Sequence, residues 1–127
     1  MKVALCLACD DNFIPYTAVA ARRIARYAGE KLPILVISDG VCDENKTLAR
    51  KFCPQIAFVE AGHLFDGRSL PASRNNTRAA LLRLFLDEIL SDFDRAVYLD
   101  SDISPTTDIS PLLSMAPEAA PVIAGYD

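Results

Sequence analysis

Residues 2–28 read KVALCLACDDNFIPYTAVAARRIARYA, and this stretch decides the fold. Lys2 to Cys9 is a run of strand length that is apolar after its first residue, and Asp10 and Asp11 close it. Pro15 is followed by a segment rich in alanine and arginine, Tyr16 to Ala28, which is typical of a helix with proline near its first turn. A strand that is apolar throughout favours a sheet covered on both faces. The stretch therefore predicts a buried strand, an acidic turn and a covering helix.

Strand and helix alternate again along the rest of the chain. Leu32 to Ser38 predicts a second buried strand, closed by the turn signal Asp39–Gly40, and Asp43 to Phe52 predicts a short helix with Asp43 as its N-cap. This alternation predicts a mostly parallel sheet in a doubly wound α/β domain. The other predicted elements are strand Ile56–Glu60, a loop over 61–76, helix Thr77–Leu90, strand Arg95–Asp100, a helical turn Ile109–Ser114 and strand Pro121–Tyr126.

The composition limits what the protein can be. The 127 residues are 51% hydrophobic and 24% charged, and 13 basic against 17 acidic side chains give a net charge of −4, which fits one folded domain. An acidic balance argues against nucleic-acid binding by bulk electrostatics and against a polybasic membrane patch. Because no apolar run approaches the roughly 20 residues that span a bilayer, and Val3–Cys9 is too short for a signal-peptide core, we expect a cytoplasmic protein.

The cysteines and the single histidine do not predict a metal site. Cys6 and Cys9 form a CxxC, but an odd spacing on a strand points them to opposite faces of the sheet. We expect these two, with Cys42 and Cys53, to act as small buried hydrophobic side chains. His63 has no second imidazole to pair with, so a solvated loop residue is expected.

Acidic residues follow each of the first four predicted strands. In an open parallel sheet, ligands bind in the crevice beyond the carboxyl ends of the strands, so an acid-lined edge is a candidate site. Asp and Asn are also ordinary turn residues, and for Asp39 that simpler interpretation is favoured. The polar residues at this edge are Asp10, Asp11, Asn12, Asp39, Glu60, Asp100 and Asp102.

Asp100 and Asp102 directly follow the apolar residues 96–99. If the backbone is still extended there, residues two apart point the same way and their carboxylates lie roughly 7 Å apart, so one cation could bridge them. Oxygen-only ligands select a hard divalent ion, Mg²⁺ or Mn²⁺, which usually completes its shell with substrate phosphate and water. The pair therefore predicts a metal and diphosphate site.

Arg83 interrupts a largely apolar face of the predicted helix, since Ala79, Ala80 and Leu86 lie three or four residues away. A guanidinium that faces the core needs a carboxylate or phosphate partner. Two interpretations stay open: a salt bridge to Asp87, or contact with the strand-end acids or with a substrate's phosphate or sugar. The core stripe of this helix is expected to consist of Leu82, Phe85, Leu86, Ile89 and Leu90.

Together, these motifs resemble those of the family 8 retaining glycosyltransferases, which include bacterial lipopolysaccharide galactosyl- and glucosyltransferases and glycogenin. The resemblance covers nearly the whole chain. Residues 8–13, ACDDNF, look like the family's opening nucleotide motif, with Phe13 in place of the usual tyrosine. Residues 82–84 look like its Arg-Leu helix motif, residues 95–102, RAVYLDSD, like its DxD-bearing strand, and residues 108–112 like the segment after it.

The resemblance implies a Rossmann-like GT-A fold and a nucleotide-sugar donor, usually a UDP-hexose. The acceptor it implies is a saccharide such as lipopolysaccharide. On the nucleotide side, Asp10 and Asn12 would hydrogen-bond the uracil and ribose. Ala8 would lie at the base, and the backbone at Ser101 would border the ribose.

The resemblance also implies how the reacting end of the donor is held. Asp100 and Asp102 would bind Mn²⁺, or Mg²⁺, against the diphosphate. Arg83 would contact the donor sugar or phosphate and order the DxD residues. Asp127 stands where the family places an acceptor- or donor-sugar contact, and Asn75 is a weaker candidate for facing the acceptor.

The chain also departs from the family pattern. Family members normally continue into a second half with a histidine metal ligand, in a His-x-x-Gly-x-x-Lys-Pro-Trp motif, and most of the acceptor site, and His63 does not match that motif. We therefore expect residues 1–127 to be the nucleotide-sugar-binding part of a glycosyltransferase domain, without its acceptor-binding half. Such a piece could self-associate through an uncovered sheet edge, and missing segments could attach the whole protein to the inner membrane.

Two other interpretations stay open. The first is a non-catalytic fragment that keeps the nucleotide-sugar site without turnover. The second is a phosphohydrolase with Asp100 as nucleophile in a DxDx(T/S) signature that ends at Ser104, although that signature normally ends the first strand. A phospho-acceptor receiver domain also uses acids after strands, but the distance from Asp10 to Asp100 is too long for its compact sheet.

Overall fold

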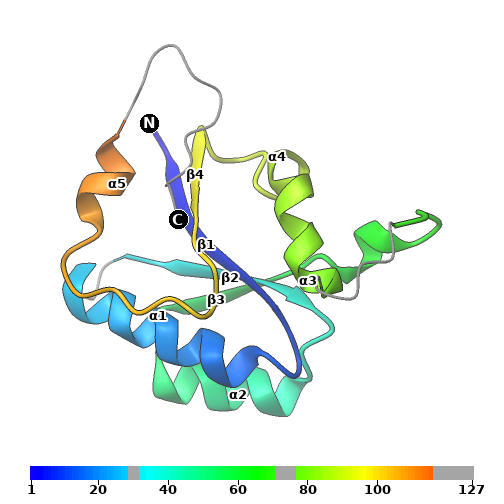
Figure 1. The fold of residues 1–127 in the computed structure, drawn as a ribbon, viewed down its shortest axis with the longest axis horizontal. Coiled ribbons are helices and arrows are strands. Elements are labelled where there is room, and N and C mark those ends of the chain that lie inside the picture. The colour runs from blue at the N-terminus through cyan, green and yellow to red at the C-terminus, as the bar shows by residue number, and fades with distance from the viewer. Residues whose placement is uncertain (29–31, 71–76, 116–127) are drawn as a thin grey trace.

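A computed structural model describes residues 1–28, 32–70 and 77–115, and its centre is a parallel sheet. The strands lie in the order β3-β2-β1-β4, with all three pairings parallel (Figure 1). Asp10 lies opposite Asp39, and Ser38 lies opposite Glu60, so the carboxyl ends of the strands meet at one edge. The strands are β1 Val3–Asp10, β2 Ile34–Asp39, β3 Ile56–Glu60 and β4 Arg95–Tyr98.

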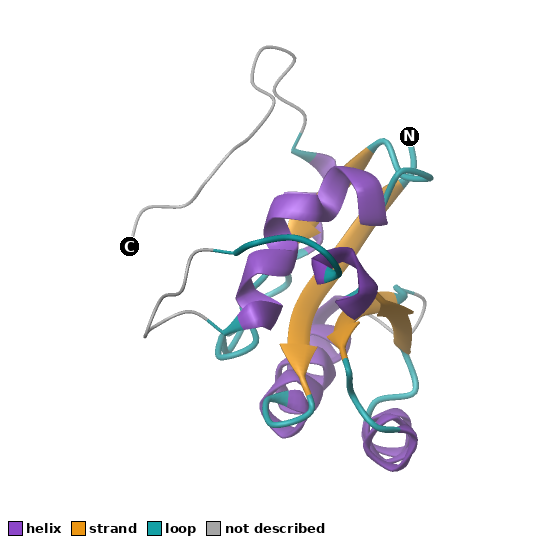
Figure 2. Ribbon diagram, turned by 90° about the vertical axis from the view of Figure 1, so that its right-hand side faces the viewer, coloured by secondary structure: helices purple, strands orange, loops and turns teal. Residues whose placement is uncertain are grey.

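Helices cover both faces of this sheet, as the doubly wound prediction requires (Figures 1 and 2). On one face lie α1 Ile14–Ala28, α2 Asp43–Phe52 and α5 Ser110–Ser114. On the other lie η1 Gly62–Phe65, α3 Arg78–Leu81, η2 Leu82–Phe85 and α4 Leu86–Ile89. The expected fifth strand, Pro121–Tyr126, falls outside the described residues.

Strand β1 lies inside the sheet and is buried on both faces. Leu5, Leu7 and Cys9 pack on the side of α1 and α2, and burial of each leucine contributes about 2 kcal/mol. Ala4, Cys6 and Ala8 face the other side, where small side chains let the helical segments after residue 77 come close. Cys6 and Cys9 therefore point to opposite faces, as the odd spacing predicted.

Small shifts at the ends of β1, β2 and α5 aside, three features differ from the sequence prediction. The N-cap of α2 is Cys42 rather than Asp43. Strand β4 ends at Tyr98, two residues before the predicted end. The helix expected over Thr77–Leu90 consists of α3, η2 and α4, because the backbone tightens into a 3₁₀ turn and Phe85 then leaves the helical region at φ −115° and ψ 18°.

The remaining expectations on burial are confirmed except for Cys42, which was expected to be buried. Leu82 and Leu90 are fully buried, and Phe85, Leu86 and Ile89 pack against the same cluster. His63 is exposed, Cys6, Cys9 and Cys53 are buried and Cys42 is half-buried. None of the helices that the structure describes is long and apolar enough to cross a membrane.

Candidate functional site

The turn between β1 and α1 is closed by the Asp10 side chain. Its Oδ1 accepts hydrogen bonds from the backbone N–H groups of Asn12 and Phe13, both at 3.0 Å. These N–H groups precede α1, where backbone donors otherwise have no partner in the chain. Oδ2 of Asp10 has no hydrogen bond within the described residues, and the Asn12 side chain is exposed. Both side chains therefore keep polar groups available at the sheet edge.

Asp11 points away from this turn and binds the start of α2. Its Oδ1 accepts from the Cys42 backbone N–H at 2.8 Å and from Asn45 Nδ2 at 3.0 Å. The Cys42 N–H bond is the main reason that the pKa of Asp11 lies below its ordinary value. A carboxylate also suits the positive end of the helix dipole. Asp11 thus fixes the N-cap residue of α2, although no side chain caps the first backbone N–H groups of that helix.

Two further edge acids are paired with cations. Asp39, at the end of β2, forms an ion pair with Arg78 of α3. Glu60, at the end of β3, forms an ion pair with Lys46 of α2. Both acids therefore have structural partners, which agrees with the simpler interpretation for Asp39.

Asp100 and Asp102 lie in a turn, so the extended backbone on which their predicted separation depended is not present. The Leu99 N–H still bonds the Cys6 carbonyl at 2.9 Å, but the chain then turns, with the Ile103 N–H 3.4 Å from the Asp100 carbonyl. The turn follows from Ser101, whose buried side chain points inward. Asp100 and Asp102 on either side of it are exposed.

Ser101 fixes this turn to β1. Its Oγ donates to the carbonyl of Ala8 at 3.0 Å, so the turn rests against the buried end of the strand. In the part of the chain that the structure describes, neither the Asp100 nor the Asp102 carboxylate has an ion pair or a hydrogen bond within the usual distance limits. They differ in this from the edge acids at 10, 11, 39 and 60.

Arg83 is exposed, so the expectation that it faces the core is wrong. That expectation assumed a continuous α-helix, and η2 replaces the helix at this position. No ion pair joins Arg83 to Asp87 among the described residues. Burial, followed by the charge of Asp100, raises the pKa of Tyr98 to about 12, and the Arg83 guanidinium acts in the opposite direction. Arg83 and Asp100 therefore both lie near the Tyr98 phenol.

The turn offers oxygen ligands that suit a divalent cation. Two exposed carboxylates, Asp100 and Asp102, provide oxygen ligands of the kind that Mg²⁺ and Mn²⁺ prefer. Residues 1–28, 32–70 and 77–115 contain no group of three or more His, Cys, Asp or Glu placed to hold an ion. The residues fit a metal that takes its other ligands from phosphate and water.

Some candidate residues were missed, and others are not described. Thr17, on the buried face of α1, bonds Ser101, and its signal in the sequence was a single hydroxyl on an alanine-rich apolar face. The sequence pattern assigned Tyr98 to the strand and did not indicate that it lies near Asp100. Asn75 and Asp127 lie outside the described residues.

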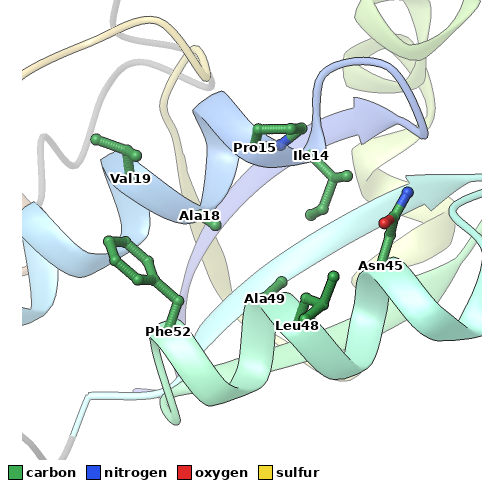
Figure 3. A pocket seen from close by; sticks show the side chains of 8 residues that line it. All are labelled: Ile14, Pro15, Ala18, Val19, Asn45, Leu48, Ala49 and Phe52. Atoms are coloured by element: carbon green, nitrogen blue, oxygen red, sulfur yellow. The ribbon is translucent and has the colours of Figure 1, made fainter.

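A separate groove of about 290 Å³ runs between α1 and α2 (Figure 3). Seven of its eight lining residues are apolar, and the amide of the eighth, Asn45, is bonded to Asp11. It lacks the charged groups that would recognise a nucleotide. The lining residues are Ile14, Pro15, Ala18, Val19, Asn45, Leu48, Ala49 and Phe52.

Comparison with known proteins identifies the family of the chain. The family model described as glycosyl transferase family 8 matches residues 4–127. The chain belongs to glycosyltransferase family 8. No curated protein sequence gives a significant match.

Solved structures show the same fold. The galactosyltransferase LgtC in complex with donor and acceptor sugar analogues superposes with a TM-score of 0.71 at 25% identity, covering 91% of this chain and 43% of that one. The LgtC active-site mutant Q189E gives 0.70 at 25% identity, with coverage of 91% and 42%. The apo bifunctional glycosyltransferase WbbM gives 0.69 at 21% identity, with coverage of 91% and 21%. This family 8 chain therefore has the GT-A fold and spans less than half the length of these relatives.

Proposed function

We propose that this family 8 chain binds a nucleotide sugar at the acid-lined sheet edge. In the whole protein this site would serve transfer of a hexose, from UDP-glucose or UDP-galactose, to a saccharide acceptor such as lipopolysaccharide, with retention of configuration. One observation carries the proposal: within the described residues Asp100 and Asp102 are exposed and form no ion pair, although the Tyr98 phenol lies beside Asp100, whereas Asp11, Asp39 and Glu60 are held by partners. The LgtC structure with donor and acceptor sugar analogues supports a sugar-transfer site on this fold.

The nucleoside would be held by the end of β1 and the turn after it. Asp10 has one carboxylate oxygen in the turn and the other without a bond in the described chain, so it can accept from a base N–H or a ribose hydroxyl. Asn12 is exposed and carries both a donor and an acceptor. The Ala8 segment and the Ser101 backbone would lie against the base and the ribose.

The diphosphate would be held at the neighbouring turn. Asp100 and Asp102 would bind Mn²⁺ or Mg²⁺, which as a Lewis acid would stabilise the negative charge that develops on the departing diphosphate. Arg83, which is exposed and whose charge acts on the Tyr98 phenol, as that of Asp100 does, would contact the donor phosphate or sugar. Asp127 stays part of the proposal as a contact to a sugar.

Calorimetric titration of UDP into the protein, with and without MnCl₂, tests the site. We expect binding that strengthens with Mn²⁺ in the wild type, and at least about tenfold weaker Mn²⁺-dependent binding after Asp100→Asn plus Asp102→Asn, because the charge-assisted contacts of two carboxylates are lost. Asp92→Asn is the matched control, since Asp92 is exposed outside the sheet edge. Equal binding by the double variant and the control would refute the assignment.

A second assay separates the competing functions. Release of UDP from UDP-glucose or UDP-galactose supports a catalytic chain, whereas UDP binding without release supports a non-catalytic fragment. A phosphohydrolase would instead release phosphate from p-nitrophenyl phosphate. That outcome is not favoured by the structure, because the Ser104 hydroxyl at the end of the signature is bonded by Arg23.

A further inference from the structure

A buried hydroxyl pair joins α1 to the turn that carries Asp100 and Asp102. Among the described residues, the buried polar side chains are Thr17, Ser38 and Ser101, and two of these three bond each other. Thr17 Oγ1 lies 2.9 Å from Ser101 Oγ, across 84 residues of sequence. Thr17 is fully buried and Ser101 is 9% exposed. This contact is therefore shielded from water.

The proton of each hydroxyl fixes the direction of the bonds. Ser101 donates its one proton to the Ala8 carbonyl, so its oxygen accepts from Thr17. Thr17 also lies 3.1 Å from the carbonyl of Phe13, four residues earlier in its own helix, which is the usual partner of a helical threonine. Because Thr17 also has only one proton, the Phe13 carbonyl and the Ser101 oxygen share it in a bifurcated hydrogen bond.

The turn is held by apolar packing on either side, where Leu99 and Ile103 contact the core, and by few polar contacts. Its backbone is tied to β1 by the Leu99 N–H before it, and the bond that closes it, from the Ile103 N–H to the Asp100 carbonyl, is long at 3.4 Å. Between these points, at residues 100–102, the one side chain that is anchored in the interior of the described fold is that of Ser101. A buried hydroxyl that loses its partner costs free energy, so the bonds of Ser101 favour one orientation of the turn.

We propose that Thr17 is a positioning residue for the divalent-cation site: through Ser101 it sets the turn that presents Asp100 and Asp102. This inference rests on the proposed function of that turn. Thr17 is itself too deeply buried to touch a ligand, so its effect passes through Ser101. The turn after β1 is closed by the Asp10 side chain independently of Thr17.

Thr17→Val tests the inference because it keeps the side-chain shape and removes the hydroxyl. Ser101 keeps its bond to Ala8 in this variant. Thr17→Ser, in contrast, keeps a hydroxyl at this position. Thr47→Val is the matched control, because Thr47 bonds the carbonyl of Asp43 four residues earlier, at 2.9 Å, on the exposed face of α2 and has no partner across the described fold.

The readouts are UDP affinity with and without MnCl₂ and amide hydrogen exchange over residues 99–103. Loss of one buried hydrogen bond predicts about tenfold weaker Mn²⁺-dependent UDP binding and faster exchange in Thr17→Val, unchanged Mn²⁺-free binding, and recovery in Thr17→Ser. Values for Thr17→Val equal to those for Thr47→Val would overturn the inference, as would equal weakening with and without Mn²⁺. If the wild type binds no UDP, the proposed function fails, whereas exchange in the ligand-free protein still shows whether Thr17 fixes the turn.

Discussion

The Arg78 guanidinium holds the Asp39 carboxylate through two hydrogen bonds, 3.1 Å from Nε to Oδ2 and 2.8 Å from Nη2 to Oδ1. It also lies over the ring of Phe65, 4.6 Å from the centroid, and Nη2 is 3.4 Å from the Gly62 carbonyl. A bidentate pair of this kind fixes both side chains more firmly than a single contact. Asp39 is neutralised at the end of β2, which distinguishes it from the exposed acids after β4.

Gly62→Ala should loosen the Asp39–Arg78 pair. A Cβ at residue 62 would lie 2.8 Å from Asp39 Oδ1, so the carboxylate must move. Because the Arg78 side chain is 55% exposed, we expect a loss of at most about 1 kcal/mol in the free energy of unfolding, measured by urea denaturation. In an Arg78→Met background the same substitution should cost less, since the pair is already broken. Additive losses in the double variant would contradict this account.

Gly40→Ala provides the contrast. Nothing lies within 4 Å of a Cβ at residue 40, but its φ of +75° is one that L-residues rarely adopt. We expect a loss of about 1 kcal/mol from backbone strain. This loss should be the same with and without Arg78→Met, as measured by the same denaturation.

Asp11→Asn should reduce the acid sensitivity of the fold. The pKa of Asp11 lies below its ordinary value of 3.8, mainly because its carboxylate accepts from the Cys42 N–H. A lowered pKa contributes stability above the ordinary value that is lost as the pH falls through the folded-state pKa. Asp11→Asn keeps an oxygen acceptor but removes this titration. Urea midpoints measured from neutral pH to below 3.8 should therefore fall less steeply than in Asp92→Asn, and equal slopes would show that the contact to α2 carries no charge dependence.

Much of the fold could be predicted because its signals are local. A single apolar run predicted that β1 is buried on both faces. The bounds of α2 and β3 were predicted as the structure has them. The errors come from distant contacts. Asp43 was a reasonable N-cap by residue type, but Cys42, whose N–H is held by the distant Asp11, occupies that position and Asp43 begins the helix.

The candidate site was likewise predicted only where its signals are local. The exposed acids after β4 followed from residue type and from the rule on strand ends. The turn at Ser101 did not, because its inward orientation depends on Ala8 and Thr17, which only the folded sheet brings together. Arg83 was expected to face the core because the helix was predicted to be continuous. No local residue pattern indicated the 3₁₀ segment.

Cys42 should be the thiol that reacts in the native protein. Burial raises the pKa of Cys6 to about 12 and that of Cys9 to about 11, and Cys53 is also buried, so these thiols are both shielded and protonated. The pKa of Cys42 also lies above its ordinary value, so Cys42 differs from the other three in access, because it is only half-buried. Labelling with Ellman's reagent at neutral pH should modify one thiol per chain, and Cys42→Ser should abolish it. Rapid labelling that persists in Cys42→Ser would contradict the burial of the other three.

Tyr98 reports on the candidate site without any ligand. Burial is the main cause that raises its pKa from 10 to about 12, and the charge of Asp100 adds to it. A raised folded-state pKa means that the stability from the neutral phenol is fully present below pH 10 and is lost as the pH rises through about 12. The free energy of unfolding should therefore fall more steeply over this range in the wild type than in Tyr98→Phe, as followed by urea denaturation in buffer containing a metal chelator.

The same phenol can test whether Arg83 and Asp100 lie together. Asp100→Asn removes a negative charge that disfavours the tyrosinate, so the Tyr98 transition in an absorbance titration should move down toward 10. Arg83→Met removes a positive charge that favours it, so the transition should move up. Tyr98→Phe assigns the transition among the four tyrosines, because the highest step should disappear. If neither charge variant shifts that step, Arg83 and Asp100 do not share the surroundings of Tyr98, and the role of Arg83 at the diphosphate loses its structural support.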